Sequence, residues 1–322
     1  MSSAHYLYQN LSAMSRIDDL RLFYNHTIQP ELLRLEHNRK RLIRLLIFSA
    51  VALVAVFAVT LALNILPITL ALCIPVVLYI GYLLRQIRKF QLKFKPHILN
   101  LVLDFLDNDI HYGTLKYDPE KEISREHFEH SQLFANDAIE FDGEDYIYGR
   151  VGEMDFELCE LEVNEFSKVR NRVDNVFKGV FLHSQFQQDF AGRILIMPKA
   201  LRQYAIRSIK HFTRQNASKV LVQQTHNLGF DEQFLTYATP DASVSRLLSM
   251  EMQDSILRYQ DSTGCPVYIS FIGNHIYVAV QQDTDMLEPF LIQSNVSFDL
   301  ILEYYQKIEL LLSIIRDFDV NN

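Results

Sequence analysis

Residues 45–84 read LLIFSAVALVAVFAVTLALNILPITLALCIPVVLYIGYLL, and none of these side chains is charged. Asn64 and Pro67 interrupt the apolar run near its middle and divide it into residues 45–63 and 67–84. A bilayer core about 30 Å thick needs roughly 20 apolar residues in one helix. Each half is just long enough, so the pattern predicts a transmembrane helical hairpin with a very tight turn. A hairpin that enters one leaflet without crossing stays open, because the turn is so short.

Basic residues flank the apolar run on both sides. They are Arg39, Lys40, Arg41 and Arg44 before it, and Arg85, Arg88, Lys89, Lys93 and Lys95 after it. Lys and Arg in short flanking segments favour the cytoplasmic side of a membrane. We therefore expect both termini to be cytoplasmic. Residues 1–28 lack the apolar core of a signal peptide, so the first span is expected to be an uncleaved anchor.

Charge divides the chain into two parts. Residues 1–95 carry 12 Lys and Arg against 4 Asp and Glu, whereas residues 96–322 carry 19 against 35. The acidic C-terminal part argues against nonspecific binding to nucleic acid. Three cysteines, Cys73, Cys159 and Cys265, are too few for a disulfide framework and indicate a reducing compartment.

The sequence on either side of the hairpin predicts four regions. Residues 1–44 form a cytoplasmic helical stalk, in which one helix lies near residues 14–26 and another runs from residue 29 into the first span. The hairpin occupies residues 45–84. Residues 85–135 form a juxtamembrane helical connector, and residues 136–322 form a cytoplasmic α+β domain.

Alternating polar and apolar residues predict mostly antiparallel strands in that domain. Asp142-Gly143-Glu144-Asp145 is read as a hairpin turn, and the alternation changes phase near Leu158, which predicts a bulge or bend there. Further strands are expected at residues 176–186, 193–197 and 219–223, with a helix at 198–215.

The C-terminal third carries two helix starts and one hairpin. Thr239-Pro240-Asp241 is typical of a helix start, and Gly264 should end that helix. Gly273-Asn274 suits a two-residue turn between strands 266–272 and 275–280. Ser297 can cap a final helix. The predicted fold class is therefore α+β, an antiparallel sheet with flanking helices.

Several blocks of the chain resemble one bacterial family of membrane proteins, the domain of unknown function 3137 family. The blocks are Leu115-Lys116-Tyr117-Asp118-Pro119 with Ile123, Phe128, Ser131, Leu133 and Phe134; Asp142-Gly143-Glu144-Asp145 with Gly149, Gly152, Phe156 and Glu160; Phe177-Lys178-Gly179-Val180-Phe181 with Phe186, Phe190 and Gly192; Phe230-Asp231-Glu232-Gln233-Phe234 with Tyr237; and Ile269-Ser270-Phe271-Ile272-Gly273-Asn274 with Tyr277 and Leu287-Glu288-Pro289. Residues 244–250 depart from the family pattern, which leaves the start of the following helix open.

The resemblance implies a location in the bacterial inner (plasma) membrane and a LemA-like membrane protein as a neighbour or partner. The family has no established activity, so the resemblance supplies no catalytic residues.

Histidines and carboxylates offer only incomplete metal sites. His127 and His130 lie three residues apart on an expected helix, but two histidines make a poor zinc site, and nothing in the spacing selects His97, His111 or Cys159 as a third ligand. Asp142, Glu144 and Asp145 supply too few oxygens for calcium. We predict no metal and no cofactor.

Catalytic motifs are equally scarce. Cys265 and His275 lie on adjacent strands of the expected hairpin, but a nucleophilic pair needs contact and a third orienting group. Phosphate-binding glycine loops and zinc-protease motifs do not occur. The sequence therefore predicts no catalytic residue and no enzyme.

A basic stretch without acids, residues 191–229, is the most informative candidate surface. Its basic residues are Arg193, Lys199, Arg202, Arg207, Lys210, Arg214 and Lys219. They can contact anionic lipid, acidic strands of this chain or a partner, or form an ordinary solvated helix face. The acidic stretch 137–165 is likewise a docking surface or an exposed sheet face.

The leading hypothesis is an integral membrane protein whose cytoplasmic domain is a non-enzymatic binding or scaffold module for a protein partner. The alternatives are a membrane-bound hydrolase with an unrecognised site and a sensor of anionic lipid surfaces. The membrane bilayer is an expected partner, nucleic acid is not, and self-association into a homo-oligomer stays open.

Overall fold

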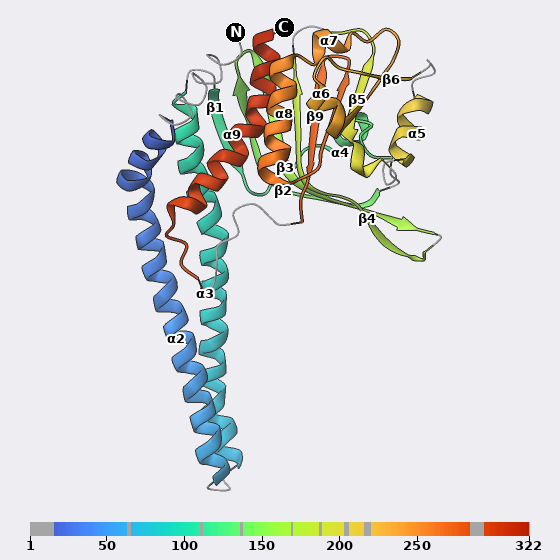
Figure 1. Cartoon of the computed structure of the whole chain (residues 1–322). Coiled ribbons are helices and arrows are strands. Elements are labelled where there is room, and N and C mark those ends of the chain that lie inside the picture. Colours follow the sequence, from blue (N-terminus) through green and yellow to red (C-terminus); the bar gives the residue numbers. More distant parts are fainter. Residues whose placement is uncertain are drawn as a thin grey trace. The chain divides into compact units, whose positions relative to one another are not determined.

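The computed structural model contains long helices and one large sheet (Figure 1), and it describes residues 16–62, 66–109, 112–135, 138–168, 170–186, 189–202, 206–215, 220–283 and 293–321. The described residues fall into two compact units, one within residues 1–101 and 287–302, the other within 102–286 and 303–322. Two helices, α3 (Leu66–Asp107) and α9 (Phe298–Asn321), contribute residues to both units. The α+β fold class is confirmed.

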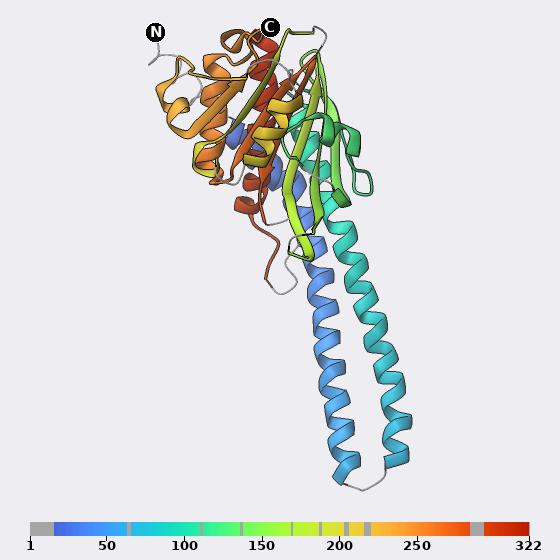
Figure 2. The ribbon, with the colours of Figure 1, turned by 90° about the vertical axis from the view of Figure 1, so that its right-hand side faces the viewer.

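The helical unit is built on α2 (Gln29–Ala62) and the part of α3 up to residue 101. These two helices lie side by side in both views (Figures 1 and 2). The predicted helix from residue 29 into the first span is confirmed, and a π-helical segment (Tyr24–Ile28) precedes it. The predicted turn between the spans lies largely outside the described residues, which omit 63–65.

Several side-chain contacts of the helical unit lie near the N-terminal end of α2, before the apolar run. His97 lies 3.3 Å from a carboxylate oxygen of Glu31, and the rings of Tyr24 and Phe298 meet edge to face at 5.4 Å. Glu36 and Arg39 form a buried ion pair with contacts of 2.8 and 2.6 Å. These contacts hold the polar stalk together without using the apolar part of α2.

The apolar part of α2 is exposed. Phe48, Val51, Val54 and Phe57 keep between 52% and 73% of their surface accessible. Among the described residues, one helix (Arg16–Val59) is long and apolar enough to cross a membrane, and only 6% of its most apolar window is buried. A core helix of a soluble protein would bury this surface, which this helix does not do.

The sheet unit contains nine antiparallel strands in the part of the chain that the structure describes. Their order across the sheet is β1-β2-β3-β4-β9-β8-β5-β7-β6. The strands are β1 (Tyr112–Asp118), β2 (Ala138–Val151), β3 (Met154–Ser167), β4 (Arg172–Gln185), β5 (Arg193–Pro198), β6 (Leu221–Gln223), β7 (Phe234–Ala238), β8 (Val267–Ile272) and β9 (His275–Gln281).

Helices cover both faces of this sheet. Phe128 and Phe212, from α4 (Arg125–His130) and α5 (Ile206–Gln215), join the core on one face, and α8 (Met250–Thr263) lies with α9 on the other (Figure 1). The remaining short helices are η2 (Lys199–Leu201), α6 (Leu228–Gln233) and α7 (Val244–Leu247).

One prediction about the first strands is wrong, and another is confirmed only in its position along the sheet. Asp142–Asp145 is not a turn: these residues lie inside β2, and the chain reverses at Gly152 and Glu153. The change of phase near Leu158 is not a bulge in β3, because the β3–β4 register passes Leu158 without a shift. Instead Leu158 faces one covered side of the sheet and Cys159 the other, so both are buried. The register shift at this level lies in β2, between Glu144 and Ile147.

Other predicted elements differ in extent. Residues 85–135 are not helical throughout, because they contain β1 as well as α4. The expected helix 198–215 appears as η2 and α5 with residues 203–205 undescribed between them. The helix expected at Thr239 begins later, because the Thr239 hydroxyl accepts a hydrogen bond from the Arg193 amide at 2.8 Å instead of capping a helix.

Several local signals are confirmed. Gly273 adopts a φ of +62° in the turn between β8 and β9, and Gly264 ends α8 with a φ of +67°. Both values lie in the left-handed region that glycine enters without cost. The last helix begins at Phe298, directly after Ser297.

Ser249 caps α8, and this cap can be tested. Its hydroxyl accepts from the Met252 amide at 3.2 Å. Ser249→Ala should lower the free energy of unfolding by about 1 kcal/mol, because one amide of the first turn loses its partner. Ser243→Ala is the matched control, since the Ser243 side chain makes no cap hydrogen bond to α7. Urea unfolding monitored by circular dichroism measures both; equal losses would contradict the assignment.

Candidate functional site

The short helix α4 carries two histidines over the sheet. Ser124 begins the helix by accepting a hydrogen bond from the His127 amide at 3.2 Å. Phe128 is buried, and its ring lies 5.2 Å from that of Phe181 on β4. This anchored ring fixes α4 on the sheet, so His127 and His130 are held beside the strands below.

Strand register brings three further polar residues to the same place. Glu157 on β3 is the direct cross-strand partner of His183 on β4, and His183 is the partner of Tyr277 on β9. Cross-strand partners share a face, and His275 shares it because it lies two residues from Tyr277. We call His127, His130, Glu157, His183, His275 and Tyr277 the histidine cluster.

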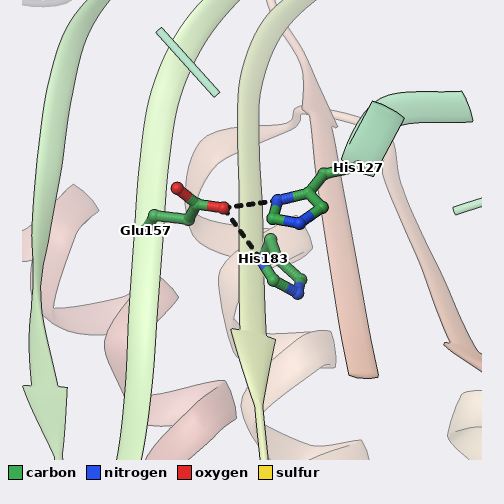
Figure 3. A group of neighbouring side chains, drawn as sticks. All are labelled: His127, Glu157 and His183. Carbon is green, nitrogen blue, oxygen red and sulfur yellow. Dashed lines mark hydrogen bonds and ion pairs between the residues drawn. The ribbon is translucent and has the colours of Figure 1, made fainter. Parts of the chain in front are cut away.

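Glu157 lies at the centre of this cluster. Its Oε1 is 2.6 Å from Nδ1 of His127 and 2.9 Å from Nδ1 of His183, so one oxygen contacts two imidazoles (Figure 3). Its Oε2 accepts a hydrogen bond from the Tyr146 hydroxyl at 2.5 Å. Both oxygens of the carboxylate are therefore occupied by side chains from three different elements.

The hydrogen bonds continue from His183 across the sheet. Nε2 of His183 lies 2.9 Å from Nδ1 of His275. Nδ1 of His130 lies 2.7 Å from the Tyr277 hydroxyl. A neutral imidazole has one N–H and one acceptor nitrogen, so a donor Nδ1 on His183 requires Nε2 to accept from His275.

Burial and charge set the protonation of the cluster. Burial alone would raise the pKa of Glu157, but hydrogen bonds from His183, Tyr146 and His127 lower it to about 2. Burial lowers the pKa of His275 to about 4, and the neighbouring histidines add to that effect. Burial also lowers the pKa of His183 and of His130. Near neutral pH the cluster thus combines the ionised carboxylate of Glu157 with neutral imidazoles at His130, His183 and His275.

A cavity of about 510 Å³ adjoins the cluster. Glu157 and His183 both line it, together with Gly113, Thr114, Lys116, Tyr146, Tyr148, Gly149, Arg150, Asp155, Phe156 and Gln185. The ammonium of Lys121 lies 4.1 Å from the centre of the ring of Tyr146, one of the lining side chains. One side of the cluster is therefore open to a molecule larger than water.

The predicted basic surface is divided by the structure. Arg207, Lys210 and Arg214 lie exposed on α5, which buries Phe212 against the sheet. Lys199 and Arg202 lie at η2, where the ammonium of Lys199 approaches the Asp231 carbonyl at 3.4 Å. Arg193 lies on β5, and Lys219 lies outside the described residues. Arg207 pairs with Glu165, so one part of the basic surface contacts the acidic strands of this chain.

The other acidic candidates gather only in part. Glu144 and Asp145 come together with Glu160 of β3, and their carboxylates lie within 4.8 Å of one another; Asp142 is not in this group. The Tyr117 hydroxyl donates to Asp145 at 2.5 Å.

The structure does not bring Cys265 to His275. Val267 pairs with Val280 at one end of the β8–β9 hairpin, whereas His275 pairs with Ile272 at the other. At about 3.3 Å per strand residue, the two side chains lie roughly 20 Å apart along the hairpin. This nucleophilic pair is excluded.

Of the three suggested third ligands for His127 and His130, the two that the structure describes lie in other contacts. His97 contacts Glu31 in the helical unit, and His111 lies outside the described residues. The sulfur of Cys159 accepts from the Ile123 amide at 3.4 Å, and burial raises the pKa of its thiol. The residues that do meet His127 are Glu157 and His183, which the spacing of the sequence did not select.

Comparison with known proteins identifies one family. Residues 175–320 match the model of a family described as protein of unknown function (DUF3137). The family resemblance is thereby confirmed over the segment from β4 through almost all of α9. No curated protein and no solved structure matches the chain.

Proposed function

We propose, from the match of residues 175–320 to the DUF3137 family, that this chain is a multi-pass protein of the bacterial inner membrane. Both termini would lie in the cytoplasm, and the sheet unit would bind a protein partner through the basic side chains of α5. The partner implied by the family resemblance is a LemA-like membrane protein.

The exposed apolar surface of α2 carries this proposal. Phe48 and Val54, with 73% and 69% of their surfaces accessible, lie in a helix whose most apolar window is only 6% buried. In the first half of α3, Ile74, Val77 and Leu78 are also at least 53% exposed. Basic residues precede the first apolar stretch and follow the second, which supports two spans with cytoplasmic ends.

Two exposed basic side chains of α5, Lys210 and Arg214, support the proposed partner surface. Arg207 pairs with Glu165, but among the described residues no carboxylate lies within ion-pair distance of Lys210 or Arg214. Both side chains are exposed on a helix whose opposite face buries Phe212. Such a surface is complementary to an acidic surface on another protein.

Reversal of these two charges tests the partner surface. In the full-length protein, Lys210→Glu with Arg214→Glu should reduce recovery of the specific membrane partner roughly tenfold or more, because like charges facing each other cost several kcal/mol. The measurement is quantitative mass spectrometry of proteins cross-linked in native membranes and purified in detergent.

The matched control is Arg170→Glu with Arg172→Glu. These residues are also exposed and give the same change of net charge, but they lie at the turn between β3 and β4 and pair with Asp174. Unchanged recovery for the α5 variant, or an equal loss for the control, would contradict the proposed surface.

A further inference from the structure

We propose that His127, Glu157 and His183 bind one divalent transition-metal ion, with zinc as the expected ion. This site lies in the sheet unit and is independent of the proposed membrane anchor and of the basic surface on α5. It adds a metal-binding activity to the proposed binding module.

The donor atoms already converge. One ring nitrogen each of His127 and His183 and a carboxylate oxygen of Glu157 lie within 4.8 Å of one another. Both histidines contact Oε1 of Glu157 through Nδ1. Zinc bonds of about 2.0–2.2 Å place neighbouring ligand atoms about 3.3 Å apart in a tetrahedral site. The observed contacts of 2.6 and 2.9 Å to Glu157 require an outward shift of about half an ångström. His127 can supply it, because its side chain is 37% exposed on a short helix.

The chemistry of the donors selects the class of ion. Two imidazole nitrogens and one carboxylate form the ligand set of open zinc sites, and they also suit other divalent transition metals. Calcium and magnesium prefer sites made of oxygen ligands alone. A transition-metal ion is therefore the match for this site.

Neighbouring side chains orient two of the three ligands. Tyr146 donates to the second oxygen of Glu157, which leaves Oε1 directed toward the two histidines. When Nδ1 of His183 binds the metal, the proton of the ring lies on Nε2 and is donated to Nδ1 of His275, 2.9 Å away. Protein metal ligands are commonly held by such outer hydrogen bonds, to carboxylates, carbonyls and other polar groups.

The remaining coordination positions face space that a ligand can enter. Glu157 and His183 line the cavity of about 510 Å³ described above. Three protein ligands beside an open cavity correspond to a zinc site that keeps a position for water, not to a closed structural site with four protein ligands.

The test is zinc binding by the full-length protein in detergent after removal of metals with a chelator. We expect one zinc ion per chain, measured by competition with a chromophoric chelator and by elemental analysis. Substitution of cobalt should give the visible absorption of a cobalt ion with nitrogen and oxygen ligands.

Variants separate ligands from neighbours. His127→Ala and Glu157→Gln should lose zinc binding, whereas Tyr146→Phe and His275→Gln should weaken it about 10–100-fold, as for other outer hydrogen-bond partners. His226→Ala, an exposed histidine on another part of the sheet unit, is the matched control and should bind as the wild type does. Circular dichroism of the metal-free variants checks that each is folded; His127→Ala removes a partly exposed side chain and should fold.

Three results would overturn the proposal. They are a wild-type protein that holds less than about a tenth of an equivalent of zinc, a folded His127→Ala variant with wild-type affinity, and equal losses in His127→Ala and His226→Ala. In each case the cluster is a hydrogen-bonded network only. None of these results bears on membrane anchoring or on partner binding, whose tests use different residues.

Discussion

Replacing Val51, Val54 and Phe57 together by aspartate should release a larger fraction of the full-length protein from the membrane, because only the second proposed span, in α3, then remains as an anchor. These side chains are 61%, 69% and 52% exposed on the apolar part of α2. Each aspartate near the centre of a transmembrane helix raises the free energy of membrane insertion by roughly 2.5–3.5 kcal/mol. The remaining apolar residues of this span cannot offset three aspartates. The measurement is the fraction of protein that stays in the membrane pellet after alkaline carbonate extraction.

Leu33→Asp is the control for this variant. Leu33 is 53% exposed on the same helix but lies before the apolar run, so the protein should remain in the pellet. A triple variant that resists carbonate as well as the wild type does would show that α2 is not an essential anchor.

Gly179→Ala should strongly destabilise the sheet unit. Gly179 lies in β4 with a φ of +145°, and a Cβ there would approach the Val280 carbonyl oxygen of β9 to 2.1 Å. Backbone strain contributes about 1–3 kcal/mol, and separating the two strands costs about 1 kcal/mol for each lost ladder hydrogen bond. We expect a loss of about 3–5 kcal/mol in the free energy of unfolding, measured by urea denaturation.

Gly264→Ala separates the cost of backbone strain from the cost of a steric clash. Gly264 also has a positive φ, +67°, but a Cβ there would meet nothing within 4 Å. Its replacement should cost only about 1–2 kcal/mol. An equal loss of stability in both variants would contradict the close approach of β4 and β9 at Gly179.

Local sequence signals predicted some elements well. The long apolar run predicted the helix through residue 62, and Gly273-Asn274 predicted the β8–β9 turn, because each signal depends on neighbouring residues alone. The acidic segment 142–145 was misread for the same reason. Its composition is typical of a turn, but residues 142–144 pair with β3, and β3 also pairs with β2 before and after them.

The histidine cluster depends on pairings that the sequence does not reveal. Ser167 pairs with Arg172 at the turn between β3 and β4. If this register continued without a shift, Leu182, not His183, would lie opposite Glu157. One additional residue in β4, between Asn175 and Phe177, shifts the register and brings His183 there. His275 is 92 residues from His183 and reaches it only because β9 pairs with β4. His127 and His130 were found because they lie on one short helix.

The basic stretch shows the limit of predicting a surface from amino-acid composition. A stretch without acids was read as one surface, yet Arg193 belongs to β5 and Arg207 to a pair with Glu165. The strand and helix that interrupt the stretch direct its side chains to different places. Lys210 and Arg214 therefore remain the residues on which the partner proposal depends.

We propose that the sheet unit is attached to the cytoplasmic face of a membrane. The direct measurement is protease digestion of the C-terminally tagged protein in intact spheroplasts and in inverted inner-membrane vesicles. We expect the tag to survive in sealed spheroplasts and to be removed in inverted vesicles. Removal of the tag from intact spheroplasts, or recovery of the whole chain in the soluble fraction before digestion, would contradict the account.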